Sequence, residues 1–250
     1  MEKNLADYKT IGIVAHSYEG GTLSLITACR EGGKLLGPHM HPNLVLSAIP
    51  MGLSMEAWET DDYHTLGTHH AKGIDQVFKS GADFFYCPDN TSHIVLEKII
   101  GDQSIPGLHI ADVVCAEIKK KGWKKIGLLG TKWTMTGPVY PRVFEKHGFK
   151  KIIPSQDIRQ KINAAIFDEL CQGIIKEETT NVFIECIKDL KTEGAECVIL
   201  GCTEIPLIIN EQNSPLPVLD STRLQAKYAV ELAISDWQIT SRGWIQLDNH

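Results

Sequence analysis

Residues 81–91 read GADFFYCPDNT and residues 194–204 read GAECVILGCTE, so the two segments align without a gap. Each consists of a glycine, a short apolar run and a polar turn, and Asp89 falls on Cys202 in the alignment. A second pair supports the first, because IGIVAH at residues 11–16 is similar to IGLLGT at residues 126–131. Recurrence of two patterns at nearly the same offset predicts two related halves.

Short β-branched runs alternate along the chain with longer segments of helical period, which predicts an α/β fold. Strands separated by helices form mostly parallel sheets covered on both faces, so we expect two pseudo-symmetric α/β/α lobes. The first lobe is expected at residues 1–112 plus 218–237 and the second at 113–217, with a loose tail at 238–250. The clearest helical patterns cover residues 63–80, 110–121, 139–147 and 162–193.

The composition describes a folded protein that is not built to bind nucleic acid. Of 250 residues, 43% are hydrophobic and 22% charged, with a net charge of −6 and no basic stripe. No apolar run approaches the roughly 20 residues that a membrane span requires, so we expect a cytoplasmic protein. The seven cysteines are scattered without a Cys-x-x-Cys pair, which favours reduced thiols and no metal. The histidine pairs at 39/41 and 69/70 are interpreted as surface residues.

Ligands of parallel α/β sheets bind beyond the carboxyl ends of the strands. The turns that follow the two repeated strands therefore predict an active-site cleft between the lobes, where Asp89 and Cys202 face each other.

Three motifs in this order resemble the signatures of the aspartate/glutamate racemase superfamily: PDNTSH at residues 88–93, GTxxT at 130–134 with a later Tyr140, and GCTEIP at 201–206. The resemblance implies no cofactor, a homodimer, an amino acid or related carboxylate as substrate, and catalytic groups on opposite faces of the carbon next to a carboxylate. It assigns Cys202 and Asp89 to catalysis and His93 and Glu204 to support. It assigns substrate binding to Asn90, Thr91, Thr131, Thr134, Thr203 and Ser17.

Inversion by proton transfer needs one group to remove the α-proton and another to return one. Cys202 fits this role by its position, because a helix N-terminus favours a thiolate. Asp89 stands where two-thiol relatives have cysteine, and a carboxylate of pKa about 4 is much less basic than a thiolate of pKa about 8.5. A protonated Asp89 that acts as a general acid is therefore favoured over an ionised Asp89 that acts as a base.

The sequence is compatible with three functions. The first is a cofactor-independent racemase or epimerase of an amino acid, of the aspartate/glutamate type. The alternative is a decarboxylase, isomerase or lyase with one thiol, acting on a related carboxylate, and the second alternative is a small-carboxylate-binding protein without turnover.

Asp89 and Cys202 also have structural interpretations that involve no catalysis. Asp89 has the sequence context of a helix N-cap, Cys202 that of a buried turn residue, and Cys87 is a candidate replacement thiol. Residues 51–54, after Pro50, offer no Arg or Lys for a distal carboxylate, so the substrate side chain stays open.

Overall fold

The computed structural model describes residues 8–240 and 242–247. The chain divides into two compact units, one formed by the residues up to Val113 with those from Thr222 onward, the other by Val114–Ser221. Each unit contains one four-stranded sheet in which all strands are parallel. This confirms the predicted α/β class with two parallel-sheet halves.

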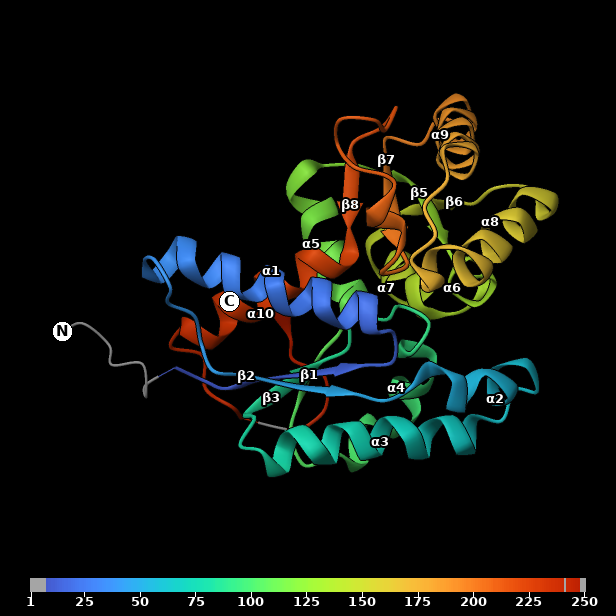
Figure 1. The fold of residues 1–250 in the computed structure, drawn as a ribbon. Coiled ribbons are helices and arrows are strands. Elements are labelled where there is room, and N and C mark those ends of the chain that lie inside the picture. Colours follow the sequence, from blue (N-terminus) through green and yellow to red (C-terminus); the bar gives the residue numbers. More distant parts are fainter. Residues whose placement is uncertain (1–7, 241, 248–250) are drawn as a thin grey trace. The chain divides into compact units, whose positions relative to one another are not determined.

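The sheet of unit 1 has the strand order β2-β1-β3-β4. Helices α1 and α3 cover its opposite faces (Figure 1). Every residue of β1 and β3 is buried, as expected for a sheet covered on both sides. The strands are β1 Ile11–Ala15, β2 Leu44–Ala48, β3 Phe84–Tyr86 and β4 Gly107–Leu108. The helices are α1 Tyr18–Leu36, η2 Met51–Ser54, α2 Met55–Glu59, α3 Tyr63–Lys79, α4 His93–Ile99 and η3 Ile100–Asp102, with most of α10 Ser221–Ile234.

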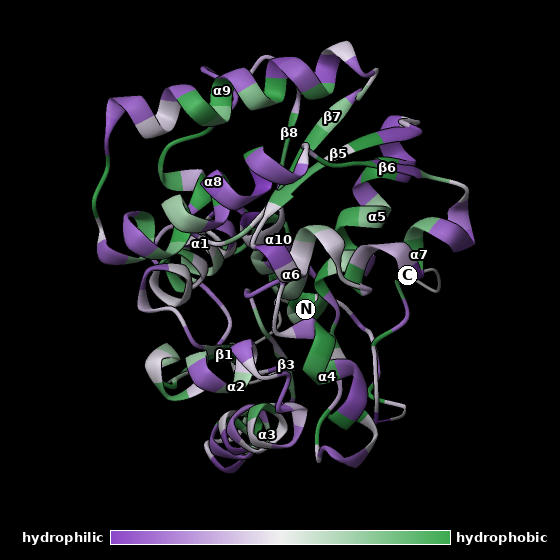
Figure 2. Cartoon of the chain, turned by 90° about the vertical axis from the view of Figure 1, so that its right-hand side faces the viewer, coloured by the Kyte–Doolittle hydropathy of each residue, from purple (hydrophilic) through white to green (hydrophobic). Residues whose placement is uncertain are grey.

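The sheet of unit 2 repeats this order as β6-β5-β7-β8. Strands β5 and β7 are largely hydrophobic, whereas α9 combines hydrophobic and hydrophilic residues, as an outer helix should (Figure 2). The strands are β5 Lys125–Gly130, β6 Lys150–Ile152, β7 Cys197–Gly201 and β8 Val218–Asp220. The helices are α5 Ile110–Lys121, whose start lies in unit 1, α6 Lys132–Thr136, α7 Val139–His147, α8 Gln156–Asp168, η4 Leu170–Gln172, α9 Glu177–Thr192 and η5 Ile205–Leu207.

The repeat in the sequence produces the same backbone geometry in both units. Gly81 and Gly194 end the preceding helices with left-handed φ values of 92° and 93°, a conformation that favours glycine. Two residues later, Asp83 accepts the backbone N–H of Thr10 at 2.7 Å. At the matching position Glu196 accepts that of Lys125 at 2.8 Å. Matching residues therefore bring the chain onto matching strands.

Two local predictions are wrong. The helix predicted over 162–193 is two helices, α8 and α9, because the chain turns at Gly173 with a left-handed φ of 69°. Part of the expected loose tail is packed instead: Trp244 forms a bridge with Gly107 and its ring lies 6.4 Å from that of Phe85, while Ile245 is 4% exposed. Residues 241 and 248–250 of that segment lie outside the described residues.

Among residues 8–240 and 242–247, no helix is both long enough and apolar enough to cross a membrane.

Candidate active site

The polar turn of unit 1 is built at the carboxyl ends of β1 and β3. These strands are adjacent, with Ile13 opposite Tyr86, so His16 and Asp89 leave the sheet side by side. The backbone N–H of His16 donates to Asp89 Oδ2 at 3.0 Å. The N-cap of α4 is Ser92 rather than Asp89, and this contact of Asp89 is therefore tertiary.

Buried polar residues adjoin Asp89 and His16 in the sequence. Asn90 is 2% exposed, and Ser17 is the N-cap of α1, where its Oγ accepts the N–H of Gly20 at 3.2 Å. Ser17 therefore has a structural role at the start of α1. Cys87 lies with Sγ 3.9 Å from Asp89 Oδ2. Burial and the charge of Asp89 raise the pKa of the Cys87 thiol well above its usual value, so Cys87 is an unreactive thiol in this state.

The polar turn of unit 2 follows the same plan. Strands β5 and β7 end opposite each other at Gly130 and Gly201. A Cβ atom on Gly130 would lie 2.7 Å from the carbonyl oxygen of Gly201, so this approach requires glycine. The residues that follow, Thr131 and Cys202, consequently begin neighbouring turns at one edge of the sheet.

Cys202 is held as a protonated thiol. Its Sγ lies 2.9 Å from Glu204 Oε2, and the Thr203 hydroxyl donates to the same oxygen at 2.7 Å. Burial, followed by the charge of Glu204, raises the pKa of the Cys202 thiol well above its usual value. The expectation that a helix N-terminus favours the thiolate is therefore wrong. The following helix, η5, has only three residues, and the charged group beside the thiol is the Glu204 carboxylate.

Thr131 caps a short helix, α6, that contains Thr134. Thr131 Oγ1 accepts the N–H of Thr134 at 3.2 Å at the start of α6, and both residues are buried. Tyr140 is fully buried and its hydroxyl is hydrogen-bonded to Ser221. Ser221 donates to the carbonyl of Leu200 at 2.7 Å. The sequence did not indicate Ser221, because it follows the last strand of the sheet without a recognisable motif.

His93 supports the turn that carries Asp89. Its Nε2 lies 3.0 Å from the carbonyl oxygen of Cys87, two residues before Asp89. A carbonyl oxygen only accepts, so Nε2 carries the proton. The His93 ring packs at 4.4 Å against the ring of His109, edge to face. His93 therefore links the start of α4 to the end of β3.

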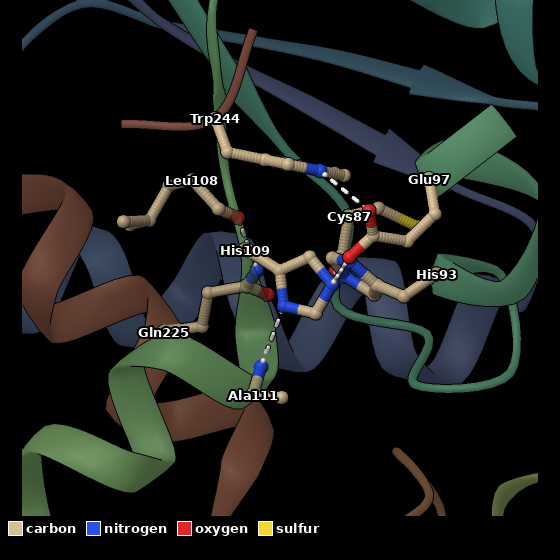
Figure 3. A network of polar contacts seen from close by, with 8 residues as sticks. All are labelled: Cys87, His93, Glu97, Leu108, His109, Ala111, Gln225 and Trp244. Carbon is tan, nitrogen blue, oxygen red and sulfur yellow. Dashed lines mark hydrogen bonds and ion pairs between the residues drawn. The ribbon is translucent and has the colours of Figure 1, made fainter. Parts of the chain in front are cut away.

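A chain of polar contacts behind His93 extends to the C-terminal segment (Figure 3). His109 Nδ1 accepts the N–H of Ala111 at 3.1 Å, so the proton of the neutral ring is on Nε2, which lies 3.0 Å from Glu97 Oε1. The indole N–H of Trp244 donates to Glu97 Oε2 at 3.2 Å. The sequence could not indicate this chain, because Trp244 lies 147 residues from Glu97.

The family model for Asp/Glu/Hydantoin racemases matches residues 19–229. The chain has two parallel-sheet units with polar turns after corresponding strands. It belongs to this racemase family.

Relatives of known name share about three in ten residues with the chain. Broad specificity amino-acid racemase RacX of Bacillus subtilis is 28% identical over 162 residues, which are 63% of this chain and 68% of RacX. A structure from Yersinia pestis, provisionally named an Asp/Glu racemase, is 31% identical with a TM-score of 0.82 and covers 91% of this chain and 100% of its own. The aspartate racemase homologue PH1733 of Pyrococcus horikoshii is 29% identical with a TM-score of 0.74, at the same coverage.

Proposed function

We propose that the protein is a cofactor-independent racemase or epimerase of an amino acid, of the aspartate/glutamate type, acting by proton transfer at the α-carbon. The observation that carries the proposal is the equivalent placement of Asp89 and Cys202, each in the turn after the third strand of its own unit's sequence. Family membership and the amino-acid racemase relative agree with this chemistry.

The hydrogen bonds of the two turns suggest how one direction of the reaction begins. The N–H of His16 donates to Asp89 Oδ2, which favours the carboxylate form of Asp89, whereas burial and the charge of Glu204 favour the thiol form of Cys202. We propose that Asp89 removes the α-proton of one enantiomer and that Cys202 delivers its proton to the opposite face of the carbanion. Asp89 is then protonated and Cys202 is a thiolate, the reverse arrangement from which the other enantiomer reacts.

Glu204 and the hydroxyl residues have separate roles in this proposal. Glu204 holds the thiol proton of Cys202 in a fixed direction, which makes it a positioning residue. The hydroxyls and amide of Thr131, Thr134, Thr203, Asn90, Thr91 and Ser17 bind the substrate's α-carboxylate and stabilise the negative charge that develops on it. His93 maintains the turn that contains Asp89.

The test is loss of the α-proton signal in deuterated water, followed by proton NMR for each enantiomer of a panel of amino acids without added cofactor. The parent is compared with Cys202→Ser and Asp89→Asn, and with Cys29→Ser in α1 as the matched control. We expect exchange and loss of optical activity in the parent and the control, and a fall of at least about a hundredfold in both site variants.

No exchange by a folded parent would reject the racemase. A new product that forms without exchange would instead support the decarboxylase, isomerase or lyase, because Asp89 rather than a second cysteine stands at the position equivalent to Cys202. We also propose a homodimer located in the cytoplasm, with sedimentation velocity as the test of its mass.

A further inference from the structure

Two buried histidines lie directly beside the Asp89 turn in unit 1. His16 follows β1 and uses its backbone N–H to bind Asp89. Its ring lies 4.1 Å from that of His70 on α3, with the two planes 34° apart. His16 is 8% and His70 1% exposed. The interpretation of His70 as a surface residue is therefore wrong, because this side of α3 packs on the sheet.

Three ring nitrogens of this pair have no hydrogen-bond partner within the described parts of the chain: His16 Nδ1, His16 Nε2 and His70 Nε2. Buried polar atoms are normally paired, and leaving them unpaired is costly. An incoming ligand group that pairs with them would recover this cost. Across the described ranges no three His, Cys, Asp or Glu residues are grouped as metal ligands, so the pair is not part of a conventional protein metal site.

The hydrogen-bonding capacity of the pair can be worked out from its contacts. His70 Nδ1 lies 2.7 Å from the carbonyl oxygen of Leu66, so Nδ1 carries the proton and Nε2 is a lone pair. Burial lowers the pKa of His70 to about 4. Burial, with His70 and His69 nearby, also holds the pKa of His16 well below its usual value. Near neutral pH the pair therefore presents two acceptors and one donor.

Helix α3 brings the pair within one residue of a contact with the loop in which the sequence offers no cation for a distal carboxylate. Ser54, at the end of the loop after β2, lies with Oγ 2.9 Å from Nδ1 of His69, the neighbour of His70. The titratable groups beside the pair are His69 on α3, which further lowers the pKa of His16, and the carboxyl group of Asp89, which accepts the backbone N–H of His16. A negative substrate side chain would meet two lone pairs and the Asp89 charge, whereas a hydrogen-bond donor would find two acceptors.

We propose that His16 and His70 form the substrate side-chain subsite and select amino acids whose side chain donates a hydrogen bond, a carboxamide, hydroxyl or ammonium, over those with a carboxylate. The inference rests on the proposed racemase function and names its substrate class. The two imidazoles act as specificity residues, and the proton transfers remain with Asp89 and Cys202.

The experiment compares isosteric substrates that differ in one donor. The kcat/KM of α-proton exchange is measured near pH 7.5 for asparagine against aspartate and for glutamine against glutamate. Serine and lysine are included to distinguish the donor types. We expect the amides to exceed the acids by about tenfold or more, the order of one buried hydrogen bond.

Two variants test the pair itself. His70→Phe keeps a ring against His16 but removes the lone pair, and should lower the amide-to-acid ratio about tenfold. His16→Met removes both ring nitrogens while keeping the N–H to Asp89, and provides the same test if His70→Phe does not fold. His64→Phe, an exposed position on the same helix, is the matched control and should leave the ratio unchanged.

Opposite results overturn the inference without touching the racemase proposal. Preference for aspartate, with a rate that rises as the pH falls, would mean that a protonated pair binds carboxylates. A ratio unmoved in both variants would mean that solvent satisfies the pair. If no amino acid exchanges, the racemase proposal fails, and the subsite is judged by calorimetric binding of asparagine and aspartate. Asparagine should then bind the parent more tightly than the His70→Phe variant, and equal or absent binding rejects the subsite.

Discussion

Gly130→Ala is expected to destabilise unit 2 because it adds an atom where two strands meet most closely. The new Cβ would lie 2.7 Å from the carbonyl oxygen of Gly201 and 3.0 Å from Thr134 Cγ2. The carbonyl belongs to the buried strand β7 and cannot rotate away without breaking the sheet. The strands must therefore separate, and with them the turns that begin at Thr131 and Cys202.

The size of the effect follows from two opposing contributions. Overpacking a rigid interior costs about 1–3 kcal/mol, and the backbone contact places this case in the upper half of that range. Replacing glycine reduces the entropy of the unfolded chain and returns about 0.4–1 kcal/mol. The expected net loss is about 2 kcal/mol, a large share of the roughly 5–15 kcal/mol that stabilises a typical protein.

Urea unfolding followed by circular dichroism measures this loss, and Gly33→Ala is the matched control. Gly33 lies within α1, where a Cβ would meet nothing within 4 Å. The same substitution should therefore stabilise the protein there by about 0.5–1 kcal/mol. The reasoning is refuted if Gly130→Ala is as stable as the parent, or if both variants lose stability equally.

Three further outcomes are expected. Glu204→Gln removes the negative charge beside Cys202, so the thiol pKa should fall and alkylation by iodoacetamide should begin at lower pH; an unchanged profile contradicts the role of Glu204. Burial lowers the pKa of His70 to about 4 from 6.5, so the unfolded state binds the proton more readily than the folded state. The free energy of unfolding should therefore be highest above pH 6.5 and fall by up to about 3 kcal/mol as the pH falls towards 4. The fall should be smaller in His70→Phe. Trp244→Phe removes the hydrogen bond to Glu97 and should cost about 1 kcal/mol in urea unfolding, since Glu97 is partly exposed; no change would show that the segment contributes only packing.

The sequence alone determined the fold class, the repeat and the positions of the polar turns. These features are local, because apolar strand runs, helical periodicity and glycines such as Gly81 and Gly194 act through neighbouring residues. The repeat also identifies Asp89 and Cys202 as equivalent positions. The sequence did not predict the turn at Gly173, because the helical periodicity is continuous there. It also did not predict the packing of Trp244, whose contacts are with residues far away in the sequence.

Only the tertiary structure decided the chemical state of the site. Cys202 is a thiol because burial and an oxygen of Glu204 at 2.9 Å disfavour its charge, whereas its motif alone suggested a thiolate. His16 and His70 form a pair because a strand end meets a helix 54 positions later in the sequence, which no periodicity encodes. Burial, charge and hydrogen-bond partners are set by residues distant in sequence, so the elements can be predicted locally while protonation and specificity depend on their packing.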